Sequence, residues 1–333
     1  MKGLWMKHQG IVTPFAFLLI APILVAAQDS NTSQLAARIE LHAIQSLTLS
    51  DEQFLKGDAA GKPAIVSGQL RIAQGSGRLP TVVMIHGAGG ISANIDLWST
   101  EFNQMGISTF VVDGFTGRGL TTVNTDQALL GRLNLLLDVY RALDVLAKHP
   151  RVDRSRVVLM GFSRGGQAAL YASLRRFQQT WNKSGVDFAA YIPFYPDCMT
   201  TYLSDTDVVN RPIRIFHGSA DDYDPVAPCK LYVERLRRAG HDVQLTEYAN
   251  APHAFDNPLY VPSPTIAKDS QTVRHCTIRE EPLGTLINGA TKQPFTYTDS
   301  CIERDAHLGY DASATQAARQ SLKSFLSAVF KLN

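Results

Sequence analysis

A serine between two glycines is the feature of the sequence with the clearest chemical meaning. Residues 161–165 read Gly-Phe-Ser-Arg-Gly and satisfy the pattern G-x-S-x-G around Ser163. On a tight strand-to-helix turn, the serine backbone is strained, and bulky side chains two residues before or after it would collide with those elements. Glycines relieve this crowding and leave the hydroxyl exposed over a helix N-terminus, where developing negative charge is favoured. We therefore expect Ser163 to be a nucleophile; a glycine-rich turn with an incidental serine is the alternative.

A serine hydroxyl becomes a good nucleophile only when a base removes its proton. His253 lies on the loop that follows the last predicted strand, which is where such a base is expected. His86 and His217 end apolar segments just before glycine, so we expect them to brace loops. Two others, His275 and His307, fall in a long irregular segment where a substrate contact stays open, and the remaining histidines are expected in packing, at the surface or in the N-terminal segment.

The imidazole in turn needs a carboxylate that fixes its tautomer and stabilises its charged form. Three candidates, Asp221, Asp222 and Asp224, lie on the loop after the predicted strand at 212–218. We choose Asp221, three residues past the end of that strand. The other two are expected to cap the following helix or to face water, and Asp197 is a less favourable substitute.

Cleavage of an ester also requires hydrogen-bond donors directed at the oxyanion that forms. We expect these donors to be the backbone N–H of Arg164, next after the serine, and that of Ala88 in the segment His-Gly-Ala-Gly-Gly. Small residues in this segment let the backbone approach the substrate. The side chains of Arg118 and Arg164 could contact an anionic part of the substrate or hold the glycine-rich turns in place.

Apolar segments of strand length alternate along the chain with helical patterns. Such alternation predicts βαβ units and a mostly parallel sheet with helices on both faces, whose ligands bind beyond the carboxyl ends of the strands. The expected strands lie at 81–86, 107–113, 156–160, 188–196, 212–218 and 243–249, with an edge strand or hairpin at 64–73. The expected helices lie at about 129–143, 229–240 and 313–331, with a helical stretch near 35–47.

The N-terminal segment has the features of an export signal. Lys2 and Lys7 precede an apolar run at 11–27 that ends in Val-Ala-Ala, so we expect a signal peptide that is cleaved after Ala27. An uncleaved membrane anchor is the alternative, but the run is short for a span and contains two prolines. The mature domain would then be residues 28–333, secreted or periplasmic, without stable membrane association.

Composition and charge exclude several classes of partner. The chain has 333 residues, of which 45% are hydrophobic and 19% are charged, as in a packed globular protein. The formal net charge is +2, and removal of residues 1–27 takes away two lysines and no acids, which leaves none. The mature chain therefore offers no electrostatic case for nucleic acid or for an anionic membrane.

Four cysteines in an exported chain suggest two disulfides. The sequence permits three pairings, and we favour Cys198–Cys229, after neighbouring predicted strands, and Cys276–Cys301. The second bridge would staple an irregular excursion at about 257–310, which is too long for a plain connection. A zinc site is the alternative, but the sequence has no C-x-x-C pair, so we expect no metal.

Five motifs in this order, HGAGG, DGFTGRG, GFSRGG, HGSADDYDP and HAFDNP, resemble those of the dienelactone hydrolase family of α/β-hydrolases. The resemblance covers about residues 64–258 and implies an α/β-hydrolase fold in a single domain. Carried over motif by motif, it makes Ser163 the nucleophile, Asp221 the acid and His253 the base. Members that hydrolyse dienelactone have a cysteine where this chain has Ser163, so the resemblance does not assign that substrate.

The sequence thus predicts an exported serine hydrolase that cleaves small carboxylic esters or lactones through an acyl-enzyme, without metal or organic cofactor. The alternatives are a serine peptidase or an acyltransferase of the same fold, and a non-catalytic binding protein on the same scaffold. The sequence leaves open the natural substrate, the oligomeric state and whether residues 257–310 act as a lid.

Overall fold

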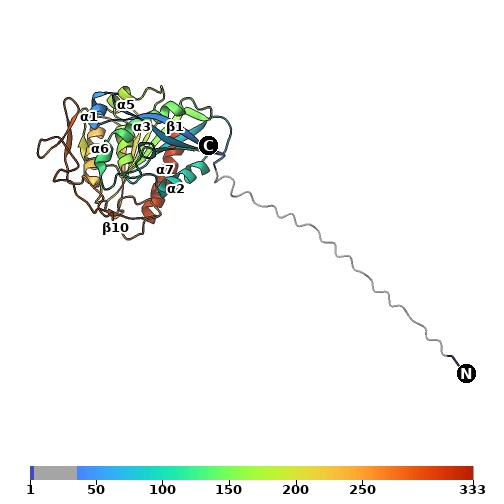
Figure 1. Ribbon diagram of the computed structural model, residues 1–333. Coiled ribbons are helices and arrows are strands. Elements are labelled where there is room, and N and C mark those ends of the chain that lie inside the picture. Colours follow the sequence, from blue (N-terminus) through green and yellow to red (C-terminus); the bar gives the residue numbers. More distant parts are fainter. Residues whose placement is uncertain (4–35, 333) are drawn as a thin grey trace. The chain divides into compact units, whose positions relative to one another are not determined.

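A central sheet of eight strands organises the chain (Figure 1). The computed structural model describes residues 1–3 and 36–332, so nearly all of the predicted signal peptide, with its cleavage site, lies outside the described residues. The strand order is β1-β2-β4-β3-β5-β6-β8-β9. The strands are β1 (Arg38–Thr48), β2 (Lys62–Ile72), β3 (Leu79–Ile85), β4 (Ser108–Asp113), β5 (Val152–Phe162), β6 (Tyr191–Phe194), β8 (Ile213–Gly218) and β9 (Val243–Tyr248).

The six strands from β4 to β9 pair in parallel, which confirms the predicted fold class. Their apolar side chains alternate between two cores. Val83 and Ile85 of β3 face one core, and Val82 and Met84 face the other. Both faces of a parallel sheet are covered, which is why these strands are continuous apolar runs in the sequence.

Helices cover both faces of the sheet. Residues of α3 (Asn134–Leu146), α4 (Arg164–Tyr171), α5 (Arg175–Trp181) and α6 (Val226–Arg238) pack into the first core. The second core contains residues of α2 (Ala93–Gln104) and α7 (Ala312–Phe330). Among the described helices, none combines the length and the apolar character that a membrane span requires. The short helices are α1 (Asp51–Lys56), η2 (Thr116–Arg118) and η3 (Gln127–Leu129).

The helix predicted near 35–47 is wrong, because most of this segment forms the edge strand β1. β1 pairs with β2 along its whole length, with Ile44 opposite Val66. Long-range pairing, which local helix propensity does not report, decides the conformation. The segment at 64–73 is therefore the second strand of a hairpin, and it also pairs antiparallel with β4.

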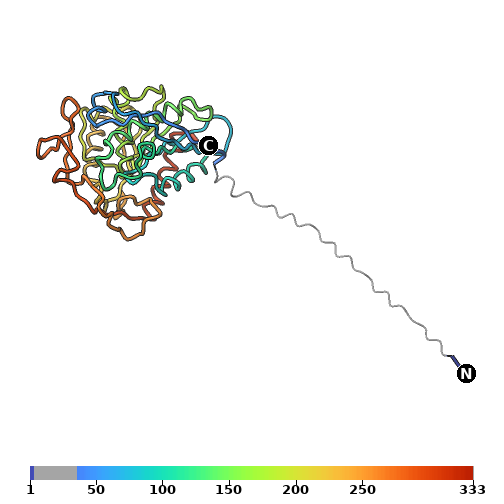
Figure 2. The backbone as a smooth tube through the Cα atoms, in the orientation of Figure 1, coloured from blue at the N-terminus to red at the C-terminus, as the bar shows by residue number. Residues whose placement is uncertain are grey.

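Residues 257–310, called the strap below, form the irregular excursion that the sequence predicts (Figure 2, orange). Only short strands interrupt it: β10 (Thr265–Ile266) pairs with β13 (His307–Leu308), and the hairpin β11 (Ile278–Glu281)–β12 (Thr285–Asn288) pairs with β7 (Thr200–Thr201). Both predicted disulfides, Cys198–Cys229 and Cys276–Cys301, are present, so the predicted pairing is confirmed.

Thiol counting tests this pairing. Denatured, unreduced protein should show no free cysteine, and replacement of Cys276 and Cys301 by serine should lower the free energy of unfolding by about 2–4 kcal/mol, because the bridge constrains the unfolded chain. Urea titration of the oxidised protein measures this loss. Four free thiols, or an unfolding curve that the double substitution leaves unchanged, would contradict the structure.

Candidate active site

Ser163 lies on a strained turn between β5 and α4. Its backbone angles are φ 52° and ψ −117°, a conformation that residues other than glycine rarely adopt. Such strain typically costs about 1–3 kcal/mol and persists only where the surroundings impose it. The helix begins at the next residue, Arg164, so the serine hydroxyl sits at the N-terminus of α4.

The neighbouring glycines show what imposes the turn. A Cβ atom on Gly161 would lie 2.0 Å from the carbonyl oxygen of Gly165. A Cβ atom on Gly165 would lie 2.4 Å from the carbonyl oxygens of both Ile85 and His86, at the end of β3. Three backbone segments therefore meet at this turn, and their contact requires the two glycines of the motif, as the sequence predicts.

The loops after β8 and β9 bring an acid and a base together. His253 donates a hydrogen bond from Nδ1 to Oδ2 of Asp221 over 2.8 Å, and both side chains are buried. The other oxygen of Asp221 accepts the backbone N–H groups of Tyr223 and Asp224 at 3.0 and 2.8 Å. The turn thus fixes the carboxylate in the position that the sequence assigns to it.

The two neighbouring acids have other partners. Asp222 accepts the backbone N–H and the Nδ1 of His307, both over 2.8 Å, and so binds the strap. Asp224 is buried beside a second, smaller cavity, and burial holds the pKa of its carboxyl well above the usual range. Neither side chain hydrogen-bonds His253, which agrees with the choice of Asp221 among the three.

Burial and charge act in opposite directions on the base. Burial by itself would lower the pKa of His253, but the charge and the hydrogen bond of Asp221 outweigh it and raise the pKa above its ordinary value. The charged form of the ring is therefore stabilised, as a group that takes up a proton during a reaction requires.

Two tyrosines hold the imidazole ring in place. The ring of Tyr223 stacks on His253 with centroids 4.8 Å apart, and Tyr195 meets it edge-on at the same distance. The hydroxyl of Tyr195 donates to the buried carboxylate of Asp256 over 2.6 Å, and Nε1 of Trp98 donates to the same carboxylate over 2.7 Å. The sequence by itself does not identify these residues as part of the site. Tyr223 and Asp256 stand within two of the quoted motifs, but their contacts arise only in the fold.

The backbone donors expected for an oxyanion are free among the described residues. The backbone N–H of Ala88 donates a hydrogen bond to none of the described residues, and neither does the backbone N–H of Arg164. A Cβ atom on Gly87 would lie 3.8 Å from the Ser163 hydroxyl, so the loop after β3 passes close to it.

His86 braces this loop, as the sequence predicts. Its Nδ1 donates to the carbonyl of Gly87 over 2.8 Å, and its Nε2 accepts the N–H of Gly114 over 3.1 Å. Burial lowers the pKa of His86 and keeps the ring neutral, which this pair of bonds requires. His217 similarly donates to the carbonyl of Gly218 over 3.2 Å.

Ser163, His253 and Ala88 line one cavity of about 200 Å³. No hydrogen bond joins the Ser163 hydroxyl to His253 within the part of the chain that the structure describes. Catalytic hydrogen bonds are often long in proteins without substrate and shorten in the complex. The arrangement places the Ser163 hydroxyl, His253 and Ala88 around one small space, with Asp221 hydrogen-bonded to His253.

The two arginines considered for substrate contact have structural roles. Arg118 binds the buried carboxylate of Asp138 over 2.6 and 2.9 Å and the carbonyl of Leu47 over 2.7 Å. It does not line the cavity, and the buried acid takes up its guanidinium, so the structure supports a structural role and the substrate contact of Arg118 stays a prediction. The side chain of Arg164 donates to the carbonyls of Leu130 and Gln127 and anchors that segment.

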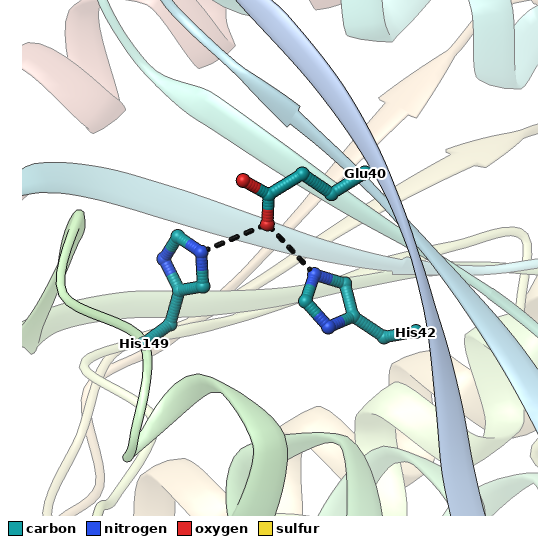
Figure 3. Close-up of side chains that lie close together, drawn as sticks. All are labelled: Glu40, His42 and His149. Atoms are coloured by element: carbon teal, nitrogen blue, oxygen red, sulfur yellow. Dashed lines mark hydrogen bonds and ion pairs between the residues drawn. The ribbon is translucent and has the colours of Figure 1, made fainter.

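One cluster among the described residues has the composition of a metal site (Figure 3). Oε2 of Glu40 lies 3.0 Å from Nε2 of His42 and 2.9 Å from Nε2 of His149. Nδ1 of His149, however, accepts the N–H of Arg151 over 3.2 Å, so the neutral ring carries its proton on Nε2 and donates it to Glu40. Arg38 also pairs with Glu40. Hydrogen bonds account for the cluster, which ties β1 to the connection before β5.

Comparison with known proteins agrees with the fold. The model of the dienelactone hydrolase family matches residues 66–275. A dienelactone hydrolase-like promiscuous phosphotriesterase from metagenomic libraries is 17% identical, with a TM-score of 0.53 over 88% of this chain and 98% of its own. A protein named m3DLH is 18% identical, with a TM-score of 0.54 over 87% and 98%. At these identities the structures support the fold alone. A search of the curated proteins finds no match.

Replacement of Gly165 by alanine tests the contact that shapes the turn. The added Cβ would meet two backbone carbonyls, which cannot move aside as a flexible side chain can, so we expect a loss of about 3 kcal/mol or more in the free energy of unfolding. Gly77→Ala, in an open loop with a positive φ, is the control and should lose only about 1–2 kcal/mol. Equal losses in urea titrations would contradict this account of the turn.

Proposed function

The chain belongs to the dienelactone hydrolase family, and from this premise we propose that it is a serine hydrolase that cleaves carboxylic esters or lactones through an acyl-enzyme. The observation that carries the proposal is the buried hydrogen bond between His253 and Asp221, beside a cavity that His253 and Ser163 both line. Triads are recognised by this geometry and by the roles of their members.

In the proposed acylation step, His253 removes the proton from the Ser163 hydroxyl as its oxygen attacks the carbonyl carbon of the ester. The carboxylate of Asp221 stabilises the resulting imidazolium. The backbone N–H groups of Ala88 and Arg164 donate to the oxyanion, and each such donor typically contributes about 10²–10³ in rate. The C–O bond to the alcohol then breaks, and His253 returns the proton to the leaving oxygen.

Deacylation repeats these steps with water. A water molecule attacks the acyl-enzyme carbonyl while His253 takes its proton, and the same donors stabilise the second tetrahedral intermediate. Collapse of this intermediate returns the proton to Ser163 and releases the carboxylic acid. In a lactone, the alcohol and the acid leave as one molecule.

The surroundings of the base suit an oxygen nucleophile. A serine hydroxyl is a far weaker acid than the thiol that dienelactone-cleaving members carry, so it needs an adjacent base that accepts a full proton. The raised pKa of His253 supports such transfer. Stacking by Tyr223 and the fixed carboxylate of Asp221 keep the ring in one orientation.

We also propose that the protein is exported. The predicted signal peptide supports this, and so do the two disulfides, since such bonds form and persist in oxidising compartments and are rare in the cytosol.

Replacement of Ser163 by alanine tests the nucleophile. We expect the variant to lose both fluorophosphonate labelling and hydrolysis of p-nitrophenyl acetate, because the attacking oxygen is gone, while its circular dichroism spectrum stays unchanged. Gel fluorescence and release of p-nitrophenol measure the two effects. If the variant cleaves the ester as fast as the wild type, the assignment of Ser163 is wrong. If the wild type neither labels nor cleaves, a binding function replaces the hydrolase.

Replacement of Asp221 by asparagine tests the acid. By analogy with serine proteases, we expect kcat to fall by about 10⁴, because the amide removes the negative charge and favours the wrong tautomer of the base. The base works in its neutral form, so activity falls as the pH drops through the pKa of His253. Since Asp221 raises this pKa, its loss should move the acid limb of the pH–rate profile to lower pH.

Asp222→Asn and Asp224→Asn are the matched controls on the same loop. Both should reduce kcat far less than Asp221→Asn does, and both should leave the acid limb closer to that of the wild type. A greater loss in either control would move the role of the acid to that residue.

A further inference from the structure

The cavity around Ser163 is small, and the strap closes one side of it. Its volume of about 200 Å³ lies below the range of about 300–1,000 Å³ that is usual for sites of drug-sized ligands. Four of its lining residues, Asn257, Tyr260, Ser270 and Leu308, come from the strap. The space beside the Ser163 hydroxyl therefore suits a small group next to the scissile bond.

The strap is fastened directly to the loops that carry the acid and the base. Leu308 forms a bridge with His253, and the N–H of Gly309 donates to the carbonyl of His253 over 3.2 Å. The carbonyl of Gln271 accepts the hydroxyl of Tyr223 over 2.9 Å. These contacts join this wall of the cavity to the loops that position the base, and the wall limits the size of the space.

Two asparagines leave hydrogen-bonding capacity in this space. Asn257 is only 4% exposed, and its Oδ1 accepts the N–H of Leu259 over 3.1 Å, but its Nδ2 donates to none of the described residues. The side-chain amide of Asn124 has no hydrogen-bond partner among the described residues either, although its backbone groups are bonded. A Cβ atom on Gly89 would lie 3.3 Å from Nδ2 of Asn124, which places that amide beside the proposed oxyanion loop.

A third asparagine in the same wall shows the contrast. Oδ1 of Asn94 accepts the hydroxyl of Ser92 over 2.6 Å, and its Nδ2 lies 3.3 Å from the carboxylate of Asp256. Both ends of Asn94 are therefore used by the protein itself. By contrast, Nδ2 of Asn257 and the side-chain amide of Asn124 can form hydrogen bonds only with water or with a ligand.

A ligand that fills so small a space displaces the water from these amides. An alkyl group would leave them buried without partners, whereas a hydroxyl group can accept from Nδ2 and donate to an amide oxygen. A site that offers hydrogen bonds to a substrate hydroxyl discriminates strongly against the analogue that lacks it.

We propose that Asn257 and Asn124 form a polar subsite that selects small esters carrying a hydroxyl group near the scissile bond. The inference rests on the proposed hydrolase function and names the substrate class for it. It assigns recognition to two residues outside the triad and leaves the chemistry of Ser163 unchanged.

The test compares pairs of esters that differ by one hydroxyl in place of one methyl. Methyl 3-hydroxybutyrate and methyl 3-methylbutanoate probe the acyl side, and 2-hydroxyethyl acetate and propyl acetate probe the alcohol side. Acid release in a pH-stat gives kcat/KM for each, divided by its rate of alkaline hydrolysis. In at least one pair we expect the hydroxylated ester to be favoured by about tenfold or more.

Substitution then assigns the preference to the subsite. Asn257→Leu and Asn124→Leu should bring the ratio in the favoured pair toward one. Asn210→Leu, an exposed asparagine that does not line the cavity, is the control and should keep the wild-type ratio. Fluorophosphonate labelling of Ser163 in each variant establishes that the site is intact, and a variant that fails to label is replaced by the corresponding Asn→Ala form.

The outcomes separate this inference from the proposed function. If the wild type cleaves all four esters through Ser163 with ratios near one, or if the ratio survives in both asparagine variants, the hydrolase stands and the subsite is wrong. If the wild type cleaves none of them and Ser163 does not label, the proposed function and this inference fail together.

Discussion

The hydrogen bond between Asp221 and His253 is the interaction on which the proposed chemistry depends. Its two partners lie 32 positions apart, on the loops after β8 and β9, and parallel pairing of these strands brings the loops together. A buried histidine would otherwise be a weak base, because burial favours the neutral ring. The carboxylate reverses this preference, and the backbone N–H groups of its own turn fix it in place.

The strap is hydrogen-bonded to the residues around this pair. It forms two hydrogen bonds with Tyr223, whose ring stacks on the imidazole, and it binds Asp222 through His307. The disulfide Cys276–Cys301 lies close in sequence to the β-bridge between Thr272 and Glu303. Thr272 is also one of the residues that hydrogen-bond Tyr223. Thus the irregular part of the chain is joined to the loops that carry the proposed acid and base, and other residues of the strap line the cavity.

The sequence predicted correctly those features that local geometry and side-chain chemistry determine. Gly161 and Gly165 could be interpreted because only a missing Cβ fits that turn, and the apolar runs identify β3 and its neighbours because both faces of the sheet are buried. It failed where distant partners decide. β1 is a strand because β2 pairs with it, and the ion pair of Arg118 with Asp138 and the contact of Tyr195 with His253 exist only after folding.

The backbone at Ser163 has a consequence for the relation between stability and activity. With φ at 52° and ψ at −117°, this position favours glycine over any residue with a side chain. A chain optimised for stability alone would carry glycine there and would lose its hydroxyl. Serine at this position therefore marks a trade-off: the protein keeps the hydroxyl and has a lower free energy of unfolding than glycine would give it.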